Sequence, residues 1–133
     1  MIVVDTNVIA YLMIRGDQTA MASKLLIRDP DWHAPLLWRS EFNNVLALHV
    51  RLRQLSLALA KEHLRFAETQ MSGREHAVDA VDVLDCAIAS GASAYDCECI
   101  VLARELQVPF ITSDRKLVRL FPDPARLLAD FVR

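Results

Sequence analysis

Hydrophobic positions along the chain fall into short apolar runs, which predict strands, and longer stretches with apolar spacings of three and four, which predict helices. The predicted strands are Ile2–Val4, Trp32–Pro35, His76–Val78 and Phe110–Thr112, with an edge strand at Arg126–Leu128. The predicted helices are Val8–Met13, Gln18–Arg28, Leu37–Arg53, Ser56–Met71, Val81–Ser90, Tyr95–Leu106 and Arg115–Phe121. Strands separated by helices of this length favour a parallel sheet covered on both faces, so the sequence predicts an α/β fold.

Length and composition indicate a single domain. The chain has 133 residues, of which 53% are hydrophobic, so it can bury one sizeable core. No apolar run approaches the roughly 20 residues that a membrane-spanning helix needs. The N-terminus lacks a basic region ahead of its short apolar run, which favours a strand over a signal peptide. We therefore expect one domain over residues 1–133, in a soluble cytoplasmic protein that does not contact a membrane.

The cysteines and histidines do not have the spacing of a zinc site. The three cysteines are odd in number and contain no C-x-x-C pair, so we expect buried apolar side chains at Cys86, Cys97 and Cys99. The histidines are scattered and form no H-E-x-x-H motif. We therefore expect surface or half-buried positions for His33, His49, His63 and His76.

Two acidic residues directly follow predicted strands. Asp5 closes the run Ile2–Val4, and Asp114 comes shortly after Phe110–Thr112. Both places correspond to the carboxyl end of a buried strand, which is the edge where open α/β sheets bind ligands. Two acids at this edge suggest a pocket for a cation.

A third acid, Glu41, lies on a predicted helix. It shares one helical stripe with Val45, Leu48 and Leu52, at spacings of four, three and four. This pattern predicts a carboxylate at one end of a core-facing stripe. No basic residue lies one turn away on that face, so the charge needs another partner.

Helix capping is the structural alternative for the other acids. Asp5 or Thr6 can cap the helix after the first strand, and Asp114 can cap the helix that follows it. Asp96 stands three residues after Ser93, a spacing that resembles a capping box. Taken singly, these acids fit caps as well as ligands.

Considered together, Asp5, Glu41, Asp96 and Asp114 favour a metal site. If the first and fourth strands are neighbours, several carboxylates converge, and at about 4 Å each like-charge pair costs on the order of 4 kcal/mol at an effective dielectric near 20. A cation removes this cost, and oxygen ligands of this kind favour Mg²⁺ or Mn²⁺. Such an ion can activate water and stabilise a phosphoryl oxygen, so the implied chemistry is phosphodiester hydrolysis.

The same acids stand in four motifs whose order resembles a known family. The motifs are Val4-Asp5-Thr6-Asn7-Val8, Ser40-Glu41-Phe42-Asn43-Asn44-Val45-Leu46, Ala94-Tyr95-Asp96 and Ile111-Thr112-Ser113-Asp114-Arg115-Lys116-Leu117. With them the chain resembles the PIN-domain ribonucleases, and in size it looks like the VapC-type toxins of toxin–antitoxin systems. The resemblance covers nearly the whole chain.

This resemblance implies a three-layer α/β/α sandwich with a short, mostly parallel sheet. It also implies a Mg²⁺- or Mn²⁺-dependent endoribonuclease that cleaves RNA, forms a homodimer and is held inactive by a cognate antitoxin. The residues it assigns to catalysis and to one or two metal ions are Asp5, Glu41, Asp96 and Asp114. The polar residues it places around them are Thr6, Asn7, Thr112 and Ser113. One departure is Cys97-Glu98-Cys99, which follows Asp96 where small and apolar residues are common.

The charge of the chain permits an RNA substrate without requiring one. The net charge is −2, but when the four acids are set aside 15 basic residues face 13 acidic ones. Twelve of the basic residues are arginines, whose planar guanidinium suits phosphate, although a GC-rich genome gives the same bias.

Two other functions fit the same residues. A catalytically silent PIN-like module would only bind RNA or protein. An aspartate-dependent phosphatase also has Asp at the end of its first strand, but it generally requires a second acid two positions later, where this chain has Asn7.

Two further groups of residues are expected to be structural. One acidic group recurs every three residues near a helix start, where the helix dipole favours acids, and we expect a solvated face: Asp79, Asp82 and Asp85. One apolar group is expected in the core and not on a partner surface: Leu36, Leu37, Trp38 and Phe42.

Overall fold

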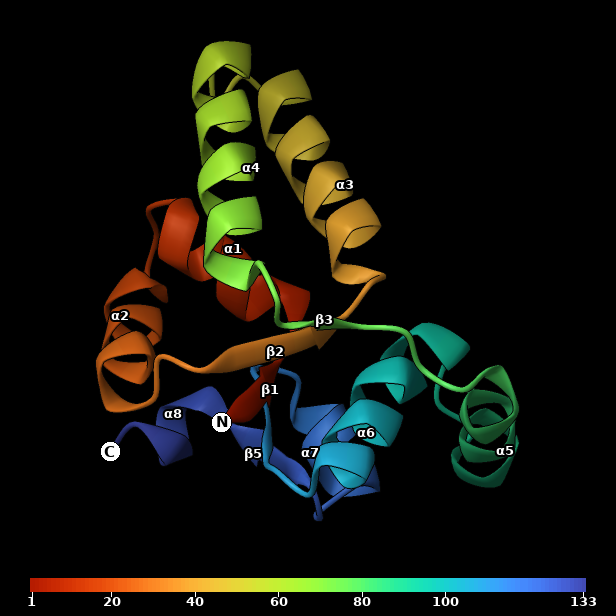
Figure 1. Cartoon of the computed structure of the whole chain (residues 1–133). Coiled ribbons are helices and arrows are strands. Elements are labelled where there is room, and N and C mark those ends of the chain that lie inside the picture. Colours follow the sequence, from red (N-terminus) through yellow and green to blue (C-terminus); the bar gives the residue numbers. More distant parts are fainter.

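The computed structural model describes residues 1–133 and contains one five-stranded sheet (Figure 1). The strands are β1 (Ile2–Val4), β2 (Trp32–Pro35), β3 (Glu75–His76), β4 (Phe110–Thr112) and β5 (Ala125–Leu127). Their order is β3-β2-β1-β4-β5, and every neighbouring pair is parallel. All five predicted strands are present, although β3 and β5 each begin one residue earlier than predicted.

Eight helices connect and cover the strands. They are α1 (Thr6–Met13), α2 (Thr19–Arg28), α3 (Trp38–Arg51), α4 (Leu57–Met71), α5 (Ala80–Ser90), α6 (Ala94–Leu106), α7 (Arg115–Leu120) and α8 (Leu128–Phe131). Seven of them match predicted helices, with ends that differ by at most two residues. The pattern does not predict α8, because four residues are too few to show a helical period.

Local side-chain bonds explain where several helices begin and end. Ser56 precedes α4, and its hydroxyl accepts a hydrogen bond from the N–H of Leu59 at 3.1 Å, as its predicted capping role requires. Ser93 does the same for the N–H of Asp96 at 3.1 Å. Gly91 ends α5 with φ of 76°, a left-handed conformation that glycine adopts without a Cβ clash.

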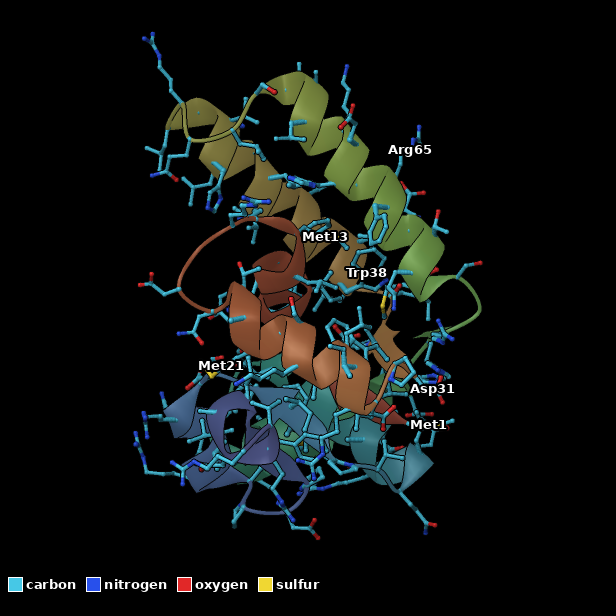
Figure 2. The ribbon with its side chains drawn as sticks, turned by 90° about the vertical axis from the view of Figure 1, so that its left-hand side faces the viewer. Met1, Met13, Met21, Asp31, Trp38 and Arg65 are labelled. Atoms are coloured by element: carbon cyan, nitrogen blue, oxygen red, sulfur yellow. The ribbon has the colours of Figure 1, made fainter.

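The sheet separates two hydrophobic cores, so the molecule has three layers. Ile2 and Val4 of β1 belong to one core, and Val3 between them belongs to the other. Helices α1 to α4 cover the first face, and α5, α6 and α7 cover the second. Figure 1 shows α3 and α4 rising from the first face as a hairpin, and Figure 2 shows Met13 and Trp38 inside this layer. The predicted α/β/α sandwich is confirmed.

The core-facing stripe predicted for α3 is wrong. Leu48 and Leu52 are 51% and 58% exposed, and Val45 is only half-buried. The stripe that is buried lies about 100° away, one residue around the helix. It consists of Trp38, Phe42 and Leu46. The apolar residues near the end of α3 stay exposed because the α3–α4 hairpin projects from the sheet (Figure 1).

Two smaller expectations are also wrong. Leu36 is 50% exposed and outside the core, because it lies in the turn between β2 and α3. His33 is buried, at 7% exposure, where a surface or half-buried position was expected. Its Nδ1 lies 2.7 Å from Nε2 of His76, and its Nε2 lies 2.9 Å from Oδ1 of Asp31. Both ring nitrogens thus have partners, which makes burial tolerable.

Leu37, also expected in the core, is half-buried and packs against neither hydrophobic core. The expectations for the cysteines and for the other two core residues hold. All three cysteines are free and buried, and Trp38 and Phe42 lie in the core. No single helix is long and apolar enough to cross a bilayer. Only α5 and α6 taken together pass a test of length and composition, and they are bent by 113° to each other.

Candidate active site

The carboxyl ends of β1 and β4 meet at the centre of the sheet. Val4 is opposite Ile111 in the parallel register, and the N–H of Asp5 donates to the carbonyl of Ile111 at 3.0 Å. The chain leaves β1 for β2 on one side and leaves β4 for β5 on the other, so this is the switch point of the sheet. Open α/β sheets bind ligands at such a point. The predicted neighbourhood of the first and fourth strands is therefore present.

A single threonine hydroxyl connects the two strand ends. Thr112 is fully buried, and its Oγ1 donates to Oδ2 of Asp5 at 2.8 Å. The same oxygen accepts a hydrogen bond from the N–H of Asp114 at 3.0 Å. Because a hydroxyl has only one hydrogen to donate, both bonds depend on one orientation of Thr112. Thr112 therefore positions the Asp5 carboxylate and the backbone that carries Asp114.

A second threonine brings α3 to the same place. Thr6 directly follows Asp5, is 5% exposed, and donates from Oγ1 to Oε1 of Glu41 at 2.9 Å. Glu41 lies in the first turn of α3, so this bond joins the starts of α1 and α3. The other two predicted polar neighbours, Asn7 and Ser113, make no side-chain hydrogen bond to an acid.

Burial and mutual repulsion act on the acids. Burial raises the pKa of the Asp5 carboxyl, the Thr112 hydrogen bond lowers it in part, and the charge of Asp96 raises it further. Burial likewise raises the pKa of Glu41, the bond from Thr6 opposes the rise, and the charges of Asp5, Asp96 and Glu98 add to it. Asp5, Glu41 and Asp96 therefore lie close enough to destabilise one another's charged forms.

Cys99 of α6 lies beneath this cluster. It is buried, and burial raises the pKa of its thiol well above the usual value, with the charges of Asp5, Glu41, Asp96 and Glu98 adding to the rise. Four carboxylates from three different parts of the chain thus raise the pKa of one buried thiol. The thiol stays protonated and acts as a small apolar side chain, as predicted for a buried cysteine.

Asp114 has a different environment from the other three predicted ligands. Its Oδ1 accepts hydrogen bonds from the N–H groups of Lys116 at 2.8 Å and Leu117 at 3.3 Å, which caps α7. The capping interpretation therefore holds for Asp114, whose side chain is exposed. It does not hold for Asp5, which precedes α1 but makes no side-chain cap bond. The N–H of Asp96 donates to the hydroxyl of Ser93, so Ser93 caps the helix at this point. The carboxylate of Asp96 has no hydrogen bond.

The donor set fits a hard cation. It consists of carboxylate oxygens, and no salt bridge reaches Asp5, Glu41, Asp96 or Asp114. As the side chains stand, no three His, Cys, Asp or Glu residues are arranged to hold a metal ion. The uncompensated charge and the oxygen-only chemistry nevertheless match what Mg²⁺ and Mn²⁺ bind.

Glu98 belongs to the acidic cluster, which the sequence did not predict, whereas the second acidic group has the structural role that was expected. Glu98 is half-buried, burial raises its pKa, and its charge acts on Glu41, so it belongs to the cluster. Its place two residues after Asp96 was the available signal. Asp79 caps α5 by accepting from the N–H of Val81 at 2.9 Å, as expected for a structural role.

Comparisons with known proteins agree with this geometry. The family model described as PIN domain matches residues 2–121. Among solved structures, the crystal structure of PAE2754 from Pyrobaculum aerophilum is similar, with a TM-score of 0.78, 21% identity, and coverage of 98% of this chain and 92% of that chain. Curated proteins give no match. The fold, the switch-point acids and the family match lead to one conclusion: the chain belongs to the PIN domain family, whose members are generally nucleases.

Proposed function

We propose that this protein is a Mg²⁺- or Mn²⁺-dependent endoribonuclease and the toxin of a toxin–antitoxin pair, acting in the cytoplasm. The observation that carries the proposal is the group of carboxylates from the end of β1, from α3 and from α6 whose charges oppose one another without a basic partner. Such an arrangement is costly unless a cation or a cationic partner occupies it. The PIN domain match supports nuclease chemistry.

The residues of the site have two roles in this proposal: some bind the metal ion, and others position the residues that bind it. A divalent ion at this site supplies a water of lowered pKa and positive charge for the phosphoryl oxygens. Asp5, Glu41 and Asp96 provide its oxygen ligands, and Asp114 completes the set from the start of α7. Thr112 and Thr6 hold Asp5 and Glu41 in place through the bonds of 2.8 and 2.9 Å. Their hydroxyls thereby fix the carboxylates before substrate binds.

The end groups of the products test the reaction. The only bonded histidine pair, His33 and His76, contacts Asp31 and not the acidic cluster. Attack through the ribose 2′-OH would use a histidine pair as acid and base, and no such pair lies at the acids, so we expect water to be the nucleophile. Cleavage should leave 5′-phosphate and 3′-OH ends, which end-labelling and mass spectrometry of the fragments would measure. Cyclic 2′,3′-phosphate ends would refute this mechanism, even if RNA is cut.

Metal binding should raise thermal stability. A ligand that binds only the folded state at one hundred times its Kd stabilises by about 2.7 kcal/mol. For a domain of this size that corresponds to a rise in Tm of roughly 10 °C. We expect Mg²⁺ and Mn²⁺ to give such a rise and Glu41→Gln to reduce it by at least about half.

The control for this titration is Glu62→Gln, because Glu62 is an exposed acid on α4 with no side-chain partner. Its variant should respond to metal as the parent does. A parent Tm that stays constant at ion concentrations that support cleavage would rule out the carboxylate site.

A homodimer and a cognate antitoxin complete the proposal. The support is the similarity in size and motifs to VapC-type toxins and the uncovered negative charge of the site. Analytical ultracentrifugation of the purified chain tests the homodimer. A monomer at working concentrations would remove the homodimer from the proposal.

A further inference from the structure

A cavity lies between α1, the loop that follows it and α3, and its lining includes Asn7, two residues after Asp5. Its volume is about 360 Å³, within the range of roughly 300–1,000 Å³ typical of small-ligand pockets. We call it the α1–α3 cavity. The lining residues that matter below are Asn7, Tyr11, Arg15, Gln18, Val45 and His49.

The lining follows two helical ladders that start next to the catalytic acids. On α1 the residues Asn7 and Tyr11 are four apart, and Asn7 is two residues after Asp5. On α3 the positions Val45 and His49 lie one and two turns after Glu41. Each step of four residues advances about 6 Å, so the cavity leads roughly 12 Å away from the acids. A nucleotide next to one held at the acids would lie within this distance.

The polar groups of the lining are free to bind a ligand. Nδ1 of His49 lies 2.8 Å from the carbonyl oxygen of Val45, and because a carbonyl only accepts, Nδ1 carries the hydrogen. Nε2 of His49 is then uncommitted. Arg15 forms no salt bridge or hydrogen bond, and the side chains of Tyr11 and Gln18 have no hydrogen-bond partner either.

The far rim is held rigidly. The hydroxyl of Thr19 accepts from the N–H of Gly16 at 3.0 Å and donates to the carbonyl of Ile14 at 3.3 Å. The N–H of Thr19 also donates to the carbonyl of Gly16 at 3.2 Å. These bonds fix the loop that carries Arg15 and Asp17. The rim therefore has a defined shape before any ligand arrives.

We propose that the α1–α3 cavity binds an unpaired RNA nucleotide adjacent to the scissile phosphate, by stacking its base on Tyr11 or His49 and binding its polar edge or phosphate with Arg15 and Gln18. Single-stranded RNA is recognised through splayed bases that stack on aromatic rings or guanidinium planes. The lining offers two rings, a cation, two amides and the acid Asp17, so it presents donors and acceptors together. A bare anion would not use the acid or the rings. This inference rests on the proposed ribonuclease function and names its substrate subsite.

RNA binding can be measured separately from cleavage. In an Asp5→Asn background with Mg²⁺, fluorescence anisotropy of a labelled single-stranded RNA pool would give the Kd. We expect Arg15→Gln and His49→Ala each to weaken binding about tenfold, which is about 1.4 kcal/mol. Tyr11→Phe keeps the ring and should change the Kd less than Tyr11→Ala. Each Tm should stay close to that of the background protein, which shows that the fold is intact.

The matched control is Arg65→Gln. Arg65 is an arginine on the outside of α4 with 81% of its side chain exposed (Figure 2). Its variant should bind RNA as the background protein does. An unchanged Kd for RNA in the Arg15→Gln/His49→Ala double variant would overturn the subsite. The subsite would also be overturned if the variants lost affinity only for a protein partner and kept their affinity for RNA. If the parent does not cleave RNA but these variants still lose RNA binding, the nuclease proposal fails and the subsite stands.

Discussion

Replacing Asp5 with asparagine is expected to reduce RNA cleavage by about a thousandfold while raising thermal stability in the absence of metal. Each tenfold loss of rate corresponds to about 1.4 kcal/mol of lost transition-state stabilisation. A thousandfold loss therefore corresponds to the several kcal/mol of transition-state stabilisation that a bound metal ion provides. Asn keeps the shape of the side chain and an oxygen that can accept the bond from Thr112. It removes the charge that burial and Asp96 disfavour.

The stability gain should depend on pH in a defined direction. Because the pKa of Asp5 is raised in the folded protein, its ionised form is destabilising once pH exceeds the folded-state pKa. The parent should therefore gain stability as pH falls from neutral toward about 4, the ordinary aspartate pKa. At neutral pH without metal, Asp5→Asn should raise Tm by about 4 °C for each kcal/mol of relieved destabilisation. The advantage of the variant should shrink as pH falls.

Asp85→Asn is the matched control for this experiment. Asp85 is an exposed acid on α5, outside the acidic cluster. Its variant should cleave RNA at the parent rate and keep the parent Tm. Equal cleavage by Asp5→Asn and the parent in Mg²⁺ would remove Asp5 from the catalytic site. If Asp5→Asn has a lower Tm than the parent at neutral pH, the charge of Asp5 does not destabilise the fold.

The second large effect is inhibition by a partner protein. The acids at the switch point carry no salt bridge, so an inserted Arg or Lys would replace the charge of a metal and form charge-assisted hydrogen bonds. We expect a small protein encoded beside this one to bind tightly and to suppress cleavage by at least about a hundredfold. That factor corresponds to a partner present at about one hundred times its Kd, which leaves roughly one per cent of the chain free.

Expression of the native operon and purification through a tag on this chain would test that expectation. The co-purifying protein should block Mg²⁺-dependent cleavage, and truncating its inserted basic residue to alanine should restore activity. An active chain recovered without a partner, and harmless to its host, would refute the toxin proposal. The nuclease proposal would remain, because it depends on the acids and not on the partner.

Much of the fold could be predicted because its local signals are strong. β2 has the predicted bounds of Trp32–Pro35, since the polar and proline-containing turn before it ends one helix clearly. α4 begins after Ser56 because that serine caps it. The stripe of Leu48 and Leu52 on α3 was misleading for a physical reason. Apolar spacing shows which residues share a face but not which face meets the sheet.

The site could be predicted only conditionally. Asp5 and the backbone of Asp114 lie near each other because β1 lies beside β4, and strand order depends on long-range pairing that no local pattern contains. Asp114 caps α7, as its capping alternative predicts, and its place in the metal site stays a prediction. Glu98 was hard to place because its side chain approaches Glu41 across two helices, and only the packed structure shows that approach.

The two threonine bonds also bear on the denticity of the carboxylates. Thr112 donates to Oδ2 of Asp5 and Thr6 donates to Oε1 of Glu41, so each threonine bond uses one oxygen of its acid. A cation bound here, as proposed, would find the other oxygen of each carboxylate free of the threonine bonds. Calcium uses bidentate carboxylates and up to eight ligands, whereas magnesium needs a small octahedral shell and keeps several waters. If the site binds a metal ion as proposed, the threonine hydroxyls would disfavour bidentate binding and so favour the smaller ion.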